Sequence, residues 1–180
     1  MITVAFRDER LDTLPALPPD IAQSVQELGA TCGPVSLAGV FGTSVVEVMR
    51  FFPGFPAQNW VTSGDMRYAL DCAGAEWQKC ATLPAIGVAL IQLEGPWTAP
   101  GVPVRAQLAH THWIAARNGY MLDLNIGDWL DVDEWLRRGA ASWMRAVRQC
   151  SGFSIRGAFA ITPRRFEFSP YGRVPRRSAR

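Results

Sequence analysis

Cys32 has the sequence context of a reactive thiol. Gly33 and Pro34 follow it and open an apolar helix whose pattern ends at Gly42, since proline favours the first turn of a helix and glycine its end. Backbone N–H groups at a helix start stabilise a thiolate, the nucleophilic form of cysteine. A free cysteine is more often a small core residue, but this context favours a nucleophile. The remaining cysteines lack it and are interpreted as core or surface thiols: Cys72, Cys80 and Cys150.

A base for this thiol must come from one of two histidines. His110 and His112 lie in the stretch Val104–Arg117, which we predict to be a strand, so both would point to the same face of a sheet. Either histidine alone fits a structural role with a bond to the backbone. A thiol nucleophile, however, needs a base and a third group that holds the imidazole in the correct tautomer.

A tight hairpin is predicted to supply that third group. Asn118-Gly119 is the strongest short hairpin signal in the chain. With these two as the turn residues, His112 faces Asn125 directly, and Asp123 is its diagonal neighbour on the same face. Both residues therefore remain candidates to orient His112.

Three segments resemble the papain superfamily of cysteine peptidases, and most closely the group related to the bacteriocin-leader (double-glycine) peptidases. The nucleophile motif of that group resembles the segment from Gln26 to Cys32-Gly33-Pro34-Val35-Ser36-Leu37-Ala38. Its histidine strand, where an aromatic residue commonly follows the histidine, is similar to His112-Trp113-Ile114-Ala115-Ala116, and its aspartate strand to Asp123-Leu124-Asn125. Its two following helices resemble Thr43–Val48 and Thr62–Leu70, so the resemblance covers roughly residues 26–126.

The resemblance implies a thiol-dependent hydrolase, a cysteine peptidase that cleaves a peptide or isopeptide (amide) bond in a peptide or protein substrate. Cys32 would be the nucleophile, His112 the base and Asp123 the third member of the triad. Gln26, six positions before Cys32, would help to form the oxyanion hole. Asn125 stays the alternate orienter because the hairpin register favours it. We expect no cofactor and no metal, since the cysteines and histidines lack the spacing of a zinc site.

Other function classes use the same residues differently. The same site could carry acyl-transferase or transglutaminase-like chemistry, and a papain-like chain without turnover could serve as a protein-interaction module. The arginines of the C-terminal tail could contact nucleic-acid phosphates. No aromatic stacking platform accompanies that tail, so a nucleic-acid partner is disfavoured.

The elements that must position these residues are predicted as helices first and strands afterwards. Residues 2–6 read as a short strand and 7–24 as an irregular lead-in. Three helices follow, with signals at Pro34, at the Ser44/Glu47 capping box and at Ser63. A fourth helix begins at Asp131. Strands are expected at Val88–Leu93, Val104–Arg117, Tyr120–Asn125 and Gly157–Thr162. This order predicts an α+β, papain-like fold with N-terminal helices packed on a C-terminal antiparallel β-sheet.

Composition fits one globular domain. The 180 residues are 48% hydrophobic and carry a formal net charge of +2, which excludes a strongly basic nucleic-acid binder. We place a single domain at 1–163 and an Arg-rich tail at 164–180. The first residues lack a signal-peptide pattern, and no apolar run reaches the roughly 18 residues of a membrane span. We therefore expect a cytoplasmic protein without a membrane partner, of bacterial or phage type. Delivery elsewhere and the oligomeric state stay open.

Overall fold

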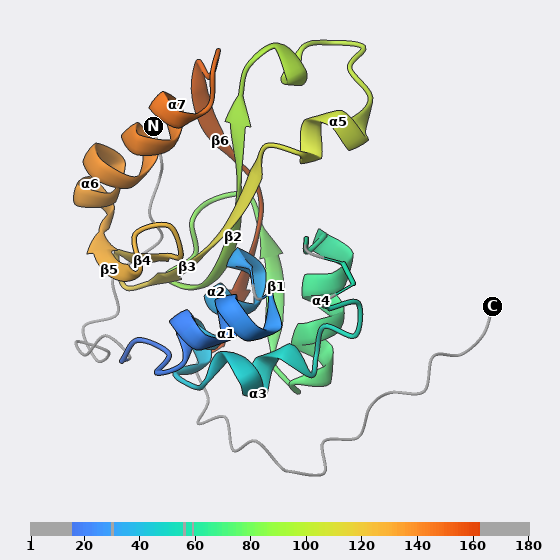
Figure 1. Cartoon of the computed structure of the whole chain (residues 1–180), viewed down its shortest axis with the longest axis vertical. Helices are drawn as coiled ribbons and strands as arrows, with labels where there is room; N and C mark the ends of the chain where they lie inside the picture. The colour runs from blue at the N-terminus through green and yellow to red at the C-terminus, as the bar shows by residue number, and fades with distance from the viewer. Residues whose placement is uncertain (1–15, 30, 56, 59, 163–180) are drawn as a thin grey trace, which may run out of the picture.

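A six-stranded antiparallel sheet forms the centre of the molecule, in the order β1-β6-β2-β3-β4-β5 (Figure 1). The structure is a computed structural model that describes residues 16–29, 31–55, 57–58 and 60–162. The strands are β1 (Trp77–Cys80), β2 (Ile86–Glu94), β3 (Thr111–Arg117), β4 (Tyr120–Asp123), β5 (Asp128–Asp131) and β6 (Gly152–Ile161). The chain is therefore a mixed α+β structure, as predicted.

Four helices precede the sheet: α1 (Ile21–Leu28), α2 (Cys32–Phe41), α3 (Val45–Met49) and α4 (Ser63–Cys72). Helix α1 was not predicted and begins inside the stretch 7–24 that was expected to be irregular. The signals expected for α2 and α3 are present. Gly42 ends α2 in the left-handed conformation at φ 67°, and Ser44 forms a capping box with Glu47. Helix α4 is capped by Thr62 together with Asp65, one residue before the predicted cap at Ser63, because the Thr62 hydroxyl reaches the Asp65 N–H. Side-chain caps thus fix the starts of α3 and α4, and a left-handed glycine ends α2.

The remaining helices lie between strands: η2 (Pro96–Thr98), α5 (Val104–Leu108), α6 (Val132–Trp135), the π-helical turn η3 (Leu136–Ala140) and α7 (Ala141–Ala146). Asp131 caps α6, as predicted, by accepting a hydrogen bond from the Glu134 N–H. The prediction of one strand over Val104–Arg117 was wrong in its first half. Pro103 directly precedes the short helix α5, and β3 starts only at Thr111.

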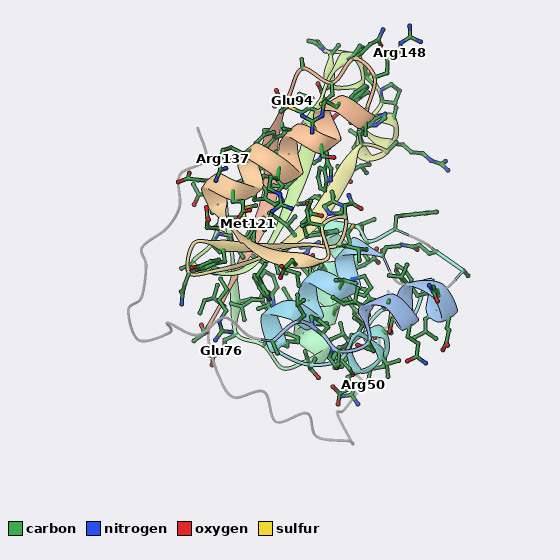
Figure 2. The ribbon with its side chains drawn as sticks, turned by 60° about the vertical axis from the view of Figure 1, so that its left-hand side comes forward. Arg50, Glu76, Glu94, Met121, Arg137 and Arg148 are labelled. Atoms are coloured by element: carbon green, nitrogen blue, oxygen red, sulfur yellow. The ribbon has the colours of Figure 1, made fainter. Side chains whose placement is uncertain are left out.

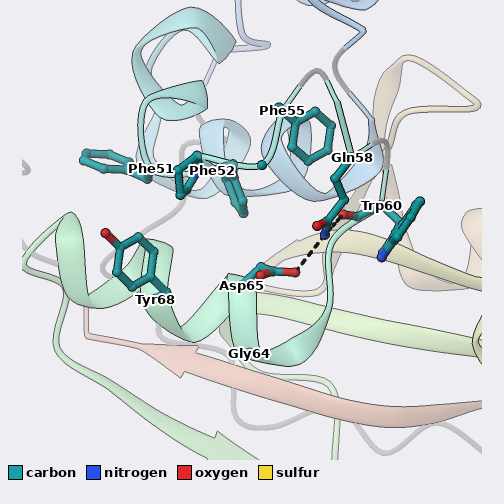
Figure 3. Close-up of a pocket in the computed structure, with 10 residues that line it drawn as sticks. Phe51, Phe52, Phe55, Gln58, Trp60, Gly64, Asp65 and Tyr68 are labelled. Carbon is teal, nitrogen blue, oxygen red and sulfur yellow. Dashed lines mark hydrogen bonds between the residues drawn. The ribbon is translucent and has the colours of Figure 1, made fainter. Parts of the chain in front are cut away.

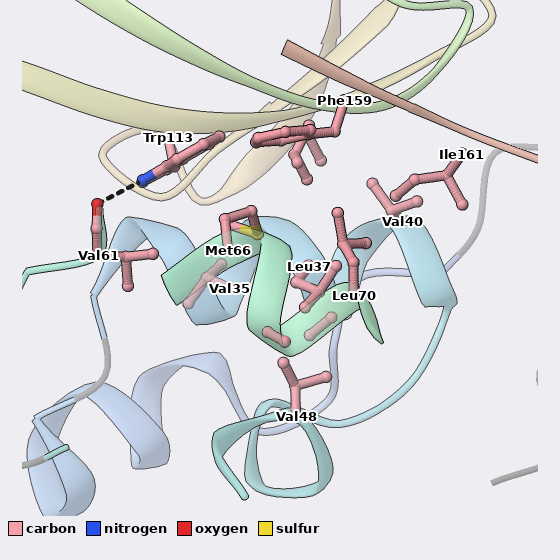
Figure 4. Close-up of a cluster of buried hydrophobic side chains, with 14 of the residues drawn as sticks. Val35, Leu37, Val40, Val48, Val61, Met66, Leu70, Trp113, Phe159 and Ile161 are labelled. Atoms are coloured by element: carbon pink, nitrogen blue, oxygen red, sulfur yellow. Dashed lines mark hydrogen bonds between the residues drawn. The ribbon is translucent and has the colours of Figure 1, made fainter. Parts of the chain in front are cut away.

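Two hydrophobic cores lie on opposite faces of the sheet. Along β2, Val88 and Leu90 join the core under α2, α3 and α4, which Figure 4 shows. The intervening residues Ala89 and Ile91 join a second core with Trp135 and other residues of α6, η3 and α7, as expected from the two-residue repeat of a strand. Figure 2 shows this second layer, with Arg137 beside it, across the molecule from Arg50. The sequence predicted the first layer and the helix that begins at Asp131, but it did not predict a second layer on the opposite face.

The predicted strand at residues 2–6 and the Arg-rich tail at 164–180 lie outside the described residues. Within the described residues, no helix combines the length and the apolar character needed to cross a membrane.

Candidate active site

Cys32 is the first residue of α2, and its thiol meets the edge of the sheet. The Trp113 backbone N–H donates a hydrogen bond to the Cys32 Sγ at 3.4 Å. Pairing between β3 and β4 runs from Arg117–Tyr120 only as far as Ala115–Leu122. Because β4 no longer pairs with β3 beyond Ala115–Leu122, the Trp113 N–H is available to the thiol. The start of α2 therefore lies where the two strands separate.

Close packing fixes the start of α2 against the segment before α4. A Cβ at Gly33 would lie 2.5 Å from a methyl carbon of Val61, so only glycine fits at this position. The buried indole of Trp113 donates to the Val61 carbonyl at 2.8 Å (Figure 4). Val61 thus contacts both Gly33, which follows Cys32, and Trp113, which follows His112. This contact holds the two halves of the site together.

His112 lies between a thiol and a buried carboxylate. Its Nε2 is 3.0 Å from Asp123 Oδ1, and Asp123 is fully buried. The other ring nitrogen, Nδ1, is left for the hydrogen bond that joins the imidazole to Cys32. The Asp123 carboxylate needs a hydrogen atom on Nε2, so in neutral imidazole Nδ1 is the free acceptor. This is the tautomer that can take the thiol proton.

Further donors fix the Asp123 carboxylate. The indole N–H of Trp135 donates to Oδ2 at 2.9 Å, and the backbone N–H of Asn125 donates to Oδ1 at 2.9 Å. A buried charge is tolerated when it is hydrogen-bonded in this way. The ring of His112 also packs edge-on against Trp143, with ring centroids 4.0 Å apart. Trp135 and Trp143 come from α6 and α7, so the second helical layer holds the aspartate and the histidine in place.

The charges of the site favour an ion pair. Burial raises the pKa of the Cys32 thiol, but the positive charge of His112 and the hydrogen bonds from His112 and the Trp113 N–H outweigh it. The net pKa of the thiol is below its usual value. Burial lowers the pKa of His112, but Cys32 and Asp123 together raise it to about 9. Both shifts favour the thiolate–imidazolium pair over the neutral pair.

The other predicted residues lie outside this contact network. Gln26 is exposed on α1, and its side chain makes no hydrogen bond to any described residue, so its amide is available to a bound molecule. Asn125 follows β4 in a turn, with an exposed side chain that does not reach His112. The expected register is confirmed from Arg117–Tyr120 to Ala115–Leu122, but the strand ends at Asp123. The structure thus brings Asp123, and not Asn125, to the imidazole.

The competing histidine and the other cysteines have different surroundings. His110 precedes β3 and stacks on Trp97, with ring centroids 3.9 Å apart. Cys80 has a pKa raised by burial. The described residues hold no group of three or more His, Cys, Asp or Glu side chains that could bind a metal ion.

An aromatic cavity lies on the helical side of the site. It has a volume of about 400 Å³ and is lined mainly by the α3–α4 connection and α4 (Figure 3). The Gln58 amide donates to the Asp65 carboxylate inside it at 3.1 Å. Trp60, an exposed lining residue, directly precedes Val61, which packs against Gly33. Trp60 is exposed, whereas Trp113 and Trp129 are buried.

Comparison with protein-family models, with curated proteins and with solved structures found no match for this chain.

Proposed function

We propose that this chain is a thiol-dependent hydrolase of papain-like type that cleaves a peptide or isopeptide bond. The observation that carries the proposal is the line of contacts from Cys32 through His112 to Asp123. The nucleophile begins a helix, and the imidazole divides its two nitrogens between the thiol and a buried carboxylate. A structural histidine needs neither a thiol neighbour nor a tautomer fixed by a carboxylate.

The geometry supports a two-step reaction. The Cys32 thiolate attacks the carbonyl carbon of the amide, and the carbon–nitrogen bond breaks as His112 gives its Nδ1 proton to the leaving amine. This leaves a thioester on Cys32. A water molecule then attacks the thioester, with His112 taking its proton as base. The carboxylic acid leaves and the Cys32–His112 ion pair is restored.

Negative charge on the carbonyl oxygen needs donors during both steps. The backbone N–H of Cys32 is one of the first N–H groups of α2, which have no partner within the helix. The exposed amide of Gln26 on α1 is the second donor in this proposal. A single donor of this kind typically contributes about 3–4 kcal/mol to the transition state. Asp123 acts through His112 by holding the ring and by stabilising its positive charge.

The experiment is the alkylation of each cysteine by iodoacetamide between about pH 5 and 9, followed by mass spectrometry, against a free-thiol pKa of about 8.5. We expect Cys32 to react fastest and to stay reactive well below the pKa of a free thiol. His112→Ala should abolish that reactivity at low pH, because burial then acts on the thiol without the imidazolium. The internal references are Cys72, Cys80 and Cys150. A Cys32 no faster than these would leave the site without its nucleophile and favour the interaction-module alternative.

A further inference from the structure

Arg156 is held in a fixed position by two uncharged side chains. Its Nη1 donates to the Gln92 Oε1 at 2.7 Å and to the Gln107 Oε1 at 3.3 Å. Gln92 is itself buried, and its amide nitrogen donates to three backbone carbonyl groups, those of Leu93, Gln107 and His110. A guanidinium positioned in this way has lost part of its conformational freedom before any ligand arrives.

The positive charge of Arg156 is not neutralised within the described part of the chain. Both of its acceptors are neutral amides, and no described carboxylate forms an ion pair with it. The side chain is exposed. Since Nη1 makes both bonds, Nη2 and Nε remain available on the planar fork that matches a carboxylate with two parallel hydrogen bonds.

The fold places Arg156 on the same face of the sheet as Cys32. Gln92 follows Leu90 by two residues on β2, so its side chain shares the face on which α2 packs. Arg156 is at the irregularity in the β2–β6 pairing, between Gly157, which pairs with Leu90, and Ile155. Its guanidinium reaches the side chain of Gln92, so it lies on that face too.

The pairing of β6, β2 and β3 gives the approximate distance between Arg156 and Cys32. Gly157 pairs with Leu90, and Leu90 pairs with Trp113, whose N–H contacts the Cys32 Sγ. Two strand spacings of about 4.8 Å place the backbone of β6 about 10 Å from Trp113. An extended peptide advances about 3.3 Å per residue, so roughly three residues span that distance.

We propose that Arg156 binds a carboxylate of the substrate a few residues from the amide bond that Cys32 attacks. This inference rests on the proposed function and assigns it a specificity: substrates with an acidic side chain, or a free C-terminal carboxylate, at that distance. Gln92 and Gln107 position the guanidinium, and Arg156 contacts the substrate.

Peptide binding to the full chain carrying Cys32→Ala tests the inference without any need for turnover. The probes are N-acetylated fluorescent peptides in which one position at a time is Glu or Gln, each with a free or an amidated C-terminus. Fluorescence anisotropy gives the dissociation constants. We expect a preference for the carboxylate of about 10- to 150-fold at one position, the range given by hydrogen bonds to charged groups. The position at which the carboxylate strengthens binding shows whether Arg156 binds an acidic side chain or the C-terminal carboxylate.

Adding Arg156→Gln should bring that preference close to one, while Arg156→Lys should retain part of it. Arg137→Gln makes the same change of charge on an exposed arginine of the other helical layer and should leave the preference intact. The proposal is overturned if no position prefers the carboxylate or if the preference survives Arg156→Gln. It is also overturned if Arg156→Gln weakens the binding of Glu and Gln peptides equally, because Arg156 would then only connect β6 to α5 through its hydrogen bonds. Alkylation of Cys32 in the unmodified chain tests the hydrolase proposal separately.

Discussion

Asp123→Asn should uncouple the imidazole from the thiol with almost no change in side-chain volume. All groups that meet the Asp123 carboxylate are donors: His112 Nε2, the Asn125 N–H and the Trp135 indole N–H. An asparagine offers a single acceptor oxygen. With this oxygen toward His112, the new NH₂ group faces the Trp135 N–H. In the flipped orientation the NH₂ group faces His112 Nε2, so the ring proton moves to Nδ1 and the base can no longer accept from Cys32.

The expected size of the effect follows from the lost bond. A hydrogen bond to a charged group contributes about 1.5–3 kcal/mol. One pKa unit corresponds to about 1.4 kcal/mol. The pKa of His112, about 9 in the unchanged chain, should therefore fall by about 1–2 units. The population of the ion pair relative to the neutral pair should fall by about 10- to 150-fold.

The assay combines a titration with a rate. Nitrogen NMR of the imidazole rings follows His112, and His110 serves as the internal reference because its ring stacks on Trp97, away from Asp123. The rate of Cys32 alkylation near pH 6 reports the thiolate. Asn125→Ala is the matched control, since only the backbone of Asn125 contacts the carboxylate. The reasoning from a charge-assisted hydrogen bond is refuted if Asp123→Asn keeps the fold, leaves the titration of His112 in place and leaves the alkylation rate of Cys32 within about twofold. If Asn125→Ala causes the loss instead, Asn125 is the orienter.

Three further outcomes are expected. The hydrolysis rate of a cleaved peptide should follow a bell-shaped pH curve, because the Cys32 thiolate takes up a proton on the acid side and His112 loses its proton near pH 9; initial rates over the pH range check it. Trp135→Phe removes the N–H that meets Asp123 and should lower the free energy of unfolding in urea by about 1–3 kcal/mol. Gly33→Ala forces a Cβ against Val61, so it should lower the free energy of unfolding by about 1–3 kcal/mol and slow the alkylation of Cys32. The control Gly64→Ala should do neither, because its Cβ would lie 3.4 Å from its nearest neighbour.

Local signals in the sequence were sufficient wherever the responsible contacts are themselves local. The Gly-Pro pair after Cys32 predicted the helix start, and Ser44 with Glu47 predicted a capping box that the structure contains. Asn118-Gly119 predicted the turn, and both residues have positive φ, at 48° and 86°. The pairing of Arg117 with Tyr120 then follows from chain geometry alone.

Features that depend on distant partners were missed. Strand β1 is short and half-exposed, and it exists because it pairs with β6, where Trp77 is opposite Ile161. The segment from Val104 was predicted as a strand on its apolar character. Val104 and Leu108 are instead exposed and lie four residues apart across a short helix. Pro103 was the signal that could have identified that helix, since proline favours a helix start.

The candidate site depends on both cores. Cys32 is held by α2 on one face of the sheet, where Gly33 packs on Val61. The orientation of His112 comes from Trp143 and, through Asp123, from Trp135 on the other face. A sequence motif around Cys32 cannot specify this second contribution. The two tryptophans lie 12 or more residues beyond Asp123, and no local spacing connects them to the imidazole. Substitutions in the second layer should therefore change the tautomer and the basicity of His112 while the surroundings of Cys32 stay intact, so the two residues can be perturbed separately.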